Sequence, residues 1–279
     1  MAQDWYRENH TPHAQIALSV RQRLFDQTSE FQRVEVVETD EYGKMLLLDG
    51  CVMCTERDEF IYHEMIIHPA LCSHPNPRDV LIIGGGDGGS VREAIRHRGV
   101  KSVTLVEIDA LVIEASRRFL PSIACGLDDP RVDIRVADGF VHLDDHQGAY
   151  DVIVVDSTDP VGPGEVLFTE DFFKKVKRAA RPGGIVVFQS ENPMYYSEVI
   201  TKMHRTLRGL FSHTGLYLAP IPTYPGGLWS FTMASDEVNP LTGKIFEGRM
   251  DPAPLKYYNP KLHRGAFLLP NYVKALVTP

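Results

Sequence analysis

The most constraining feature of this chain is an apolar run, Val80–Ile83, that continues into a loop of five glycines and one aspartate. Gly84, Gly86 and Gly89 have the G-x-G-x-x-G spacing with which a strand-to-helix turn brings a nucleotide close to the backbone. Asp87 lies inside this turn, where a dinucleotide would place its pyrophosphate. Two like charges about 4 Å apart repel by roughly 1 kcal/mol in water and about 4 kcal/mol at an effective dielectric near 20. The loop therefore favours a nucleoside that carries a positive charge.

Length and composition place the chain among ordinary globular proteins. Its 279 residues suffice for one large α/β domain and a small second one. The formal charge of −8, without a basic block, argues against a nucleic-acid partner. No apolar stretch approaches the roughly 18 residues of a membrane helix, and the first ten residues are polar, so we expect neither a membrane span nor a secretory signal. The four cysteines are expected to be reduced thiols, which predicts a cytoplasmic protein.

The N-terminal part of the chain has the pattern of a small antiparallel β domain. Apolar residues alternate over 31–39, and two further strand-like runs, 44–48 and 51–54, follow with turn residues between them. Thr55-Glu-Arg-Asp58 matches a capping box, so a helix is expected directly after it. We therefore predict a β domain over residues 1–55 and a catalytic domain over residues 56–279.

Beyond a proline-containing break at 74–78, strands and helices alternate. The strands are nearly continuous apolar runs, which indicates a parallel sheet that helices cover on both faces. Residues 212–218 and 228–233 have the pattern of antiparallel edge strands, and residues 251–260 are expected to be irregular. The strands are predicted at 80–83, 102–106, 132–136, 152–156 and 185–189, and the helices at 90–98, 110–119, 169–179 and 195–210.

Acidic residues follow three successive predicted strands. Asp87 follows the first, Glu107 closes the second, and Asp138 follows the third with Gly139 beside it. Ligands of open α/β sheets bind beyond these strand ends, where Glu107 would accept hydrogen bonds from a ribose diol and Asp138 would receive an adenine amino group. Glu107 alone could be a helix-start residue, and for Asp138 alone helix capping and ligand contact have even support. The three together favour a bound adenosyl group.

Two further acids, Asp156 and Asp159, follow the fourth predicted strand on a loop stiffened by Pro160 and Pro163. Asp159 before Pro160 could close an Asx turn, but Asp156 ends so apolar a strand that its carboxylate is expected in the same cleft as Asp87. Carboxylates that share a cavity repel one another unless a cation lies between them. This arrangement points to an organic amine, and less well to a metal ion, for which we predict no site.

Aromatic residues complete the expected amine site. Tyr62 and His63 lie on the capped helix, and Tyr224 lies in a proline- and glycine-rich loop. A buried tyrosine more often packs with its hydroxyl satisfied than takes part in chemistry. A cavity for an alkyl diamine nevertheless needs aromatic walls for the methylenes and acids for the charged ends.

At this point the chain resembles the polyamine aminopropyltransferase family, and within it the bacterial spermidine synthases. The resemblance extends over nearly the whole chain and rests on several long motifs in the same order. These motifs are Glu56-Arg-Asp-Glu-Phe-Ile-Tyr-His-Glu-Met65, Gly84-Gly-Gly-Asp-Gly-Gly89, Val106-Glu-Ile-Asp109, Asp156-Ser-Thr-Asp-Pro-Val-Gly-Pro163 and Ile221-Pro-Thr-Tyr224.

The resemblance implies transfer of an aminopropyl group from decarboxylated S-adenosylmethionine, a co-substrate rather than a cofactor, to putrescine, which gives spermidine and methylthioadenosine. It also implies a small N-terminal β domain before a Rossmann-like, methyltransferase-type domain, assembled as a homodimer or homotetramer. By the family pattern, Asp156 is the proton acceptor and Asp87 holds the propylamine nitrogen of the donor. The methylthioadenosine part would contact Gln32, Glu107, Asp138, Gly139 and Pro163, and the polyamine channel would be lined by Tyr62, His63, Asp156, Asp159 and Tyr224.

Several alternatives remain at the level of sequence. Where much of the family has glutamine, this chain has Met53, which would pack on the donor without a polar contact. Cadaverine or agmatine would replace putrescine if the channel depth differed, because one methylene is worth only about 1–3 kcal/mol of discrimination. A methyltransferase that uses intact S-adenosylmethionine has the same fold. An NAD-dependent oxidoreductase is opposed by Asp87, and a non-catalytic nucleoside-binding protein leaves Asp156 and Asp159 without a role.

Overall fold

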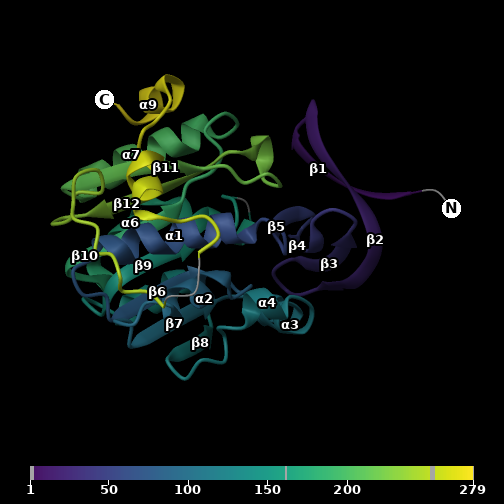
Figure 1. Cartoon of the computed structure of the whole chain (residues 1–279), viewed down its shortest axis with the longest axis horizontal. Helices are drawn as coiled ribbons and strands as arrows, with labels where there is room; N and C mark the ends of the chain where they lie inside the picture. The colour runs from purple at the N-terminus through teal and green to yellow at the C-terminus, as the bar shows by residue number, and fades with distance from the viewer. Residues whose placement is uncertain (1–2, 161, 252–254, 279) are drawn as a thin grey trace.

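The computed structural model describes residues 3–160, 162–251 and 255–278, which form two sheets (Figure 1). The N-terminal sheet is antiparallel throughout and its strands follow one another in chain order. Its first two strands form a long hairpin that projects from the rest of the molecule. The strands are β1 (Asp4–Thr11), β2 (Ala14–Thr28), β3 (Arg33–Thr39), β4 (Gly43–Leu48) and β5 (Cys51–Thr55).

The larger sheet has the order β11-β12-β10-β9-β6-β7-β8 within the described residues. The five strands β6 to β10 are mutually parallel, and β12 runs antiparallel between β10 and β11. This arrangement is the predicted Rossmann-like, methyltransferase-type sheet. The strands are β6 (Asp79–Gly84), β7 (Ser102–Glu107), β8 (Val132–Val136), β9 (Tyr150–Asp156), β10 (Ala180–Gln189), β11 (His213–Ala219) and β12 (Trp229–Ser235).

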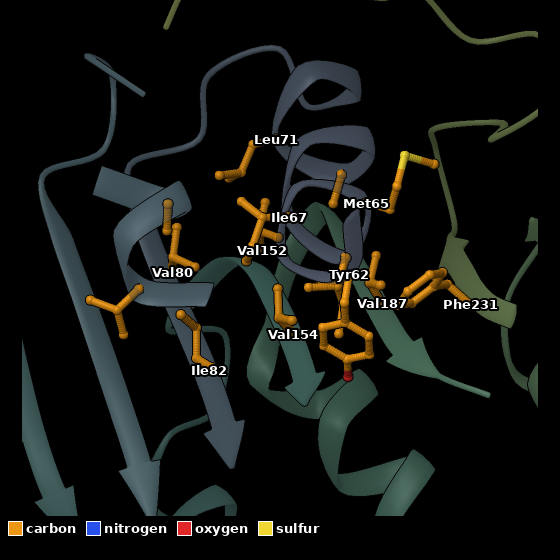
Figure 2. Close-up of a cluster of buried hydrophobic side chains, with 14 of the residues drawn as sticks. Tyr62, Met65, Ile67, Leu71, Val80, Ile82, Val152, Val154, Val187 and Phe231 are labelled. Atoms are coloured by element: carbon orange, nitrogen blue, oxygen red, sulfur yellow. The ribbon is translucent and has the colours of Figure 1, made fainter. Parts of the chain in front are cut away.

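Helices cover both faces of this sheet and make a three-layer core. On one face α1 packs Ile67 and Leu71 onto Val80 and Val152 of the central strands (Figure 2). The opposite face is covered by α6 and α7. The helices are α1 (Glu59–Ser73), α2 (Gly89–Ile95), α3 (Ala110–Phe119), α4 (Pro121–Ala124), α5 (Gly139–His142), α6 (Glu170–Ala179), α7 (Ser197–Leu210), α8 (Pro260–Ala266) and α9 (Asn271–Val277), and 3₁₀ turns occur at Leu143–Asp145, Gly162–Phe168 and Pro225–Gly227.

The structure corrects three expectations about these elements. The capping-box threonine, Thr55, does accept the Asp58 N–H at 3.3 Å, but α1 begins only at Glu59. The Asp58 carboxylate accepts the hydroxyl of Thr223 at 2.8 Å. The segment predicted at 228–233 is not an edge strand, since β12 lies inside the sheet between β10 and β11. The hairpin β1–β2 and the helices α8 and α9 were not expected from the sequence. Among the described residues, no helix is long and apolar enough to cross a membrane.

Candidate active site

The carboxyl ends of β6, β7 and β9 border a cavity of ≈ 320 Å³. The chain passes from β6 outward through β7 and β8, whereas β9 pairs with the other side of β6. Loops that leave β6 and β9 in opposite directions open a crevice at this switch point, which is where open α/β sheets bind ligands. Apolar side chains of the N-terminal sheet, Leu46, Leu48 and Met53, close the other side. The cavity thus lies between the two sheets.

Glu107 and its neighbours form one end of this cavity. The Glu107 carboxylate ends β7 and accepts the backbone N–H groups of Gly86 at 3.1 Å and of Asp109 at 3.0 Å. These two contacts fix its orientation. Burial of the carboxyl group raises the pKa of Glu107 to about 7, although the two backbone donors oppose the shift. A carboxylate that takes up a proton near neutral pH therefore lines the cavity as a hydrogen-bond acceptor.

The other residues expected around a nucleoside lie at the same end. Asp138 is exposed, caps α5 by accepting the Phe140 N–H at 2.7 Å, and also lines the cavity, so capping and lining coexist. Gly139 lies against Ile83, and a Cβ there would approach the Ile83 side chain to 2.4 Å. Gln32 donates to Asp109 at 3.1 Å and lines the wall. The side chain of Pro163 lies outside the described residues.

Asp87 and Asp156 line the same cavity, as the sequence predicted. Asp156 ends β9, and each of its oxygens accepts a neutral donor: the Tyr62 hydroxyl at 2.6 Å and the Ser90 hydroxyl at 2.6 Å. Burial raises the pKa of Asp156, and the neighbouring charge of Asp87 raises it further. The two hydroxyl groups thus fix the orientation of the Asp156 carboxylate without adding a positive charge beside it.

Asp87 has a different environment. Its Oδ1 accepts the Gly89 N–H at 2.6 Å and contacts His63 Nε2 at 3.2 Å. Burial alone would raise the pKa of Asp87, but the positive charge of His63 and the hydrogen bonds lower it below the ordinary value. The pKa of Asp87 is therefore lowered and that of Asp156 is raised within one cavity. Active sites use such a difference to give one acid the binding of a charge and the other the transfer of a proton.

A second, smaller cavity of ≈ 30 Å³ adjoins the first and holds Asp159. Met53, Tyr62 and Tyr224 line both cavities, and the Tyr224 hydroxyl donates to the Met53 carbonyl oxygen at 2.5 Å. Burial raises the pKa of Asp159. A narrow passage with aromatic sides and a carboxyl group at its end suits an extended chain of methylenes that carries a terminal cation.

The expectation for His63 needs correction. Among the described residues it lines neither cavity, because its ring packs against Gly89 behind the wall and contacts Asp87 from there. Adjacent residues of a helix point about 100° apart, and here the Tyr62 side chain lines both cavities while the His63 ring points toward Gly89 and Asp87.

The structure brings two further groups to the site that were not expected from the sequence. Ser90 follows the glycine loop and donates to Asp156. Glu8 reaches the second cavity from β1, where its Oε2 accepts the Tyr6 hydroxyl at 2.9 Å and the Val52 N–H at 2.8 Å. The position of Ser90 at a helix start was a signal that could have identified it, whereas nothing in the polar β1 segment singles out Glu8.

No metal centre accompanies these acids in the part of the chain that is described, since no group of three or more His, Cys, Asp or Glu side chains is placed to hold an ion. All four cysteines are free thiols.

Comparisons with known proteins identify the family of this chain. Residues 59–243 match the model of the spermine/spermidine synthase domain, and residues 4–56 match that of the spermidine synthase tetramerisation domain. The chain belongs to the spermidine/spermine synthase family. The polyamine aminopropyltransferase of Bacillus subtilis (strain 168) is 48% identical over 99% of this chain and 100% of its own length. That of Moorella thermoacetica is 46% identical over 97% of this chain and 95% of its own.

Solved structures of the family have the same fold. A crystal structure of spermidine synthase in complex with the transition-state analogue AdoDATO superimposes with a TM-score of 0.92 at 39% identity, covering 98% of this chain and 94% of the other. Spermidine synthase from Thermotoga maritima gives a TM-score of 0.89 at 37% identity, covering 98% and 93%. These matches make this family member an enzyme that transfers aminopropyl groups, and the tetramerisation domain supports assembly as a homo-oligomer.

The position of Asp156 depends on Gly84, which gives a first prediction. Gly84 has φ +79°, and a Cβ there would lie 2.2 Å from the Asp156 carbonyl oxygen. Gly84→Ala should displace the end of β9 and lower turnover by about a hundredfold, the cost of a displacement of roughly 1 Å. Turnover is measured as methylthioadenosine release, and stability as urea unfolding at fixed protein concentration.

Gly50→Ala is the matched control for this prediction. Gly50 has φ +80° in the β4–β5 turn, and an added Cβ meets nothing within 4 Å. Both variants share the roughly 1–2 kcal/mol cost of the left-handed backbone, but only Gly84→Ala adds the clash. Equal turnover in the two variants would contradict the prediction.

Proposed function

We propose that this enzyme transfers the aminopropyl group of decarboxylated S-adenosylmethionine to putrescine and releases spermidine and methylthioadenosine. The observation that carries the proposal is that Asp87, Asp156 and Glu107 line one cavity, with Asp156 on β9 and Glu107 on β7, the two strands that flank β6. This order of groups matches a donor with a nucleoside at one end, a sulfonium in the middle and an ammonium at the other end.

The donor would bind along the larger cavity. Glu107 would accept hydrogen bonds from the ribose hydroxyls, and Asp138 with Gly139 and Gln32 would surround the adenine. Asp87 would bind the propylamine nitrogen, and Pro163 is assigned to the methylthioadenosine site from the family pattern alone. The donor is a co-substrate, and we propose no cofactor or metal ion.

The acceptor would occupy the passage between the cavities. Its attacking nitrogen would lie at Asp156 and Tyr62, its methylenes between Tyr62 and Tyr224, and its distal ammonium near Asp159. Glu8 adds a second carboxylate at this distal end. An aliphatic diamine satisfies both ends, whereas a monoamine leaves the distal acids without a cation.

Bond formation requires a neutral attacking amine. The amine nitrogen forms a bond to the carbon next to the sulfonium, the carbon–sulfur bond breaks, and sulfur leaves as a neutral thioether. Holding an amine of pKa near 10.4 neutral at about pH 7.4 costs roughly 4 kcal/mol. The raised pKa of Asp156 makes it a better acceptor of the amine proton than an ordinary aspartate. Orientation of the amine by Asp156 and Asp159 contributes as well.

The remaining aspects of the proposal rest on the sequence and the family. We propose a homodimer or homotetramer built on residues 4–56, which match the tetramerisation domain. The cytoplasmic location expected from the reduced cysteines stays a prediction.

The proposed reaction is tested with a matrix of donors and acceptors. We expect methylthioadenosine release with decarboxylated S-adenosylmethionine and putrescine. With cadaverine or agmatine we expect kcat/KM to be roughly tenfold lower or more, because a change of one methylene in a fitted pocket is worth about 1–3 kcal/mol. Intact S-adenosylmethionine should give neither transfer of its side chain nor methylation of the amine. Higher kcat/KM with another acceptor would overturn the assignment of putrescine but not of aminopropyl transfer.

The role of Asp156 is tested by Asp156→Asn. This change keeps the shape and removes the proton acceptor, so kcat should fall by about 10²–10⁴, while the dissociation constant of the donor changes by less than about threefold. Asp159→Asn is the matched control, because it should raise the KM of putrescine more than it lowers kcat. Wild-type turnover in Asp156→Asn would exclude the proton-acceptor role.

The role of Glu107 predicts a pH dependence of nucleoside binding. Because its pKa is about 7 in the free enzyme, Glu107 is an ionised acceptor at pH 8 and mostly protonated at pH 6. Calorimetry should show that methylthioadenosine binds up to about tenfold more weakly at pH 6 than at pH 8. Glu107→Gln should bind weakly at both pH values, and a pH-independent wild-type affinity would contradict the assignment.

A further inference from the structure

A row of buried charged groups lies behind the wall that carries Asp87. His63 on α1 contacts Asp87 through Nε2 at 3.2 Å and Glu59 through Nδ1 at 2.6 Å. Arg92 on α2 then binds Glu59 with two guanidinium contacts, of 2.8 and 3.1 Å. Glu59 and His63 are 6% and 1% exposed, so this row is held inside the packing of α1 against α2.

The geometry of His63 favours the protonated ring. Each ring nitrogen faces a carboxylate oxygen. A neutral imidazole has one N–H, so one of these contacts would set two lone pairs against each other, whereas the imidazolium donates at both nitrogens. Its ring is also tightly packed, since a Cβ on Gly89 would lie 2.3 Å from it. The contacts with Asp87 and Glu59 raise the pKa of His63 well above the ordinary value in spite of burial.

The row also determines how Asp87 presents its charge. Among the described residues, the contacts of its carboxylate with Gly89 and His63 both fall on Oδ1. Asp87 itself lines the larger cavity. Several charged and titratable groups surround His63. They are Glu59 and Tyr62 on α1, Asp87 on the glycine loop, Arg92 on α2, which binds Glu59, and Asp156 on β9.

We propose that Glu59 is a positioning residue for donor binding: it holds His63 as an imidazolium in contact with Oδ1 of Asp87, and its own charge offsets that of the imidazolium, so that Asp87 presents its full negative charge to the donor's ammonium. The last step rests on the proposed function, in which Asp87 binds that ammonium. Glu59 itself lines neither cavity in the described part of the chain and acts only through His63. Arg92 keeps the Glu59 carboxylate in place from α2.

Removing the charge of Glu59 has a consequence that depends on pH. In Glu59→Gln, His63 loses one of its two anionic partners and should titrate within pH 6–8.5. At pH 8.5 the neutral ring and the neutral glutamine leave the same net charge around Asp87 as in the wild type. At pH 6 the protonated ring leaves one additional positive charge. A unit charge about 7 Å from the donor's ammonium, at an effective dielectric of about 20–40, should weaken donor binding roughly tenfold.

The experiment measures His63 directly and donor binding separately. The ligand-free enzyme is labelled with [13Cε1]histidine, and the His63 signal is assigned from its absence in His63→Gln. Wild-type His63 should remain an imidazolium from pH 6 to 8.5, whereas Glu59→Gln should titrate. The ratio of donor KM in Glu59→Gln to that in the wild type should rise roughly tenfold from pH 8.5 to pH 6, with a smaller change in kcat.

Glu64→Gln is the matched control. Glu64 is also a buried glutamate of α1, but its carboxylate accepts the backbone N–H groups of residues 256–258 and does not touch His63. It should lower thermal stability and leave both the His63 signal and the donor KM ratio unchanged across this pH range.

The possible outcomes are distinct. Wild-type His63 that is neutral at pH 7.5, or an unchanged His63 titration in Glu59→Gln, would overturn the proposal whatever the reaction is. An altered His63 titration with a pH-independent KM ratio would overturn the link to the donor alone. Failure of the wild type to use decarboxylated S-adenosylmethionine would instead refute the proposed function, and would leave the NMR result as it stands.

Discussion

The repulsion between two carboxylates in one cavity is the constraint on which this site depends. Asp87 and Asp156 line the same space, and two bare charges there would raise each other's pKa. The structure resolves the conflict differently at each acid. His63 offsets the charge of Asp87 from behind the wall, whereas Tyr62 and Ser90 give Asp156 two hydrogen bonds without a charge. One acid therefore stays ionised, and the other gains affinity for a proton.

The backbone makes this convergence possible. β6 and β9 are neighbours whose paired ends are Gly84 and Asp156, and the positive φ of Gly84 turns the glycine loop away at the point where β9 would otherwise collide with it. The same turn starts α2, which carries Ser90 to Asp156 and Arg92 to Glu59. A single strand-to-helix turn thus positions Ser90 beside Asp156 and Arg92 beside Glu59. A change in the conformation of this turn would therefore move both contacts.

The sequence predicted the parts of the site that follow from the spacing of apolar residues and from the topology of a parallel sheet. Asp87, Glu107, Asp138 and Asp156 were expected together because the carboxyl ends of parallel strands meet at one edge of a sheet. The β1–β2 hairpin was not expected, since its polar, half-exposed strands lack a clean alternation, and Glu8 was missed with it. The direction of the His63 ring was also missed, because the family pattern placed His63 in the polyamine channel beside Tyr62, while adjacent residues of a helix point about 100° apart.

The asymmetry of the two acids also bears on which donor the cavity can accept. Intact S-adenosylmethionine would bring a carboxylate toward the position where the decarboxylated donor carries only an ammonium. At about 4 Å from Asp87 that carboxylate would meet a repulsion of roughly 1–4 kcal/mol, depending on how far water is excluded. Asp87 could escape this cost by taking up a proton, but the contact with His63 lowers its pKa and opposes that route. The pairing that keeps Asp87 ionised is therefore also what would make it selective, since a protonated Asp87 would no longer distinguish a carboxylated donor from a decarboxylated one.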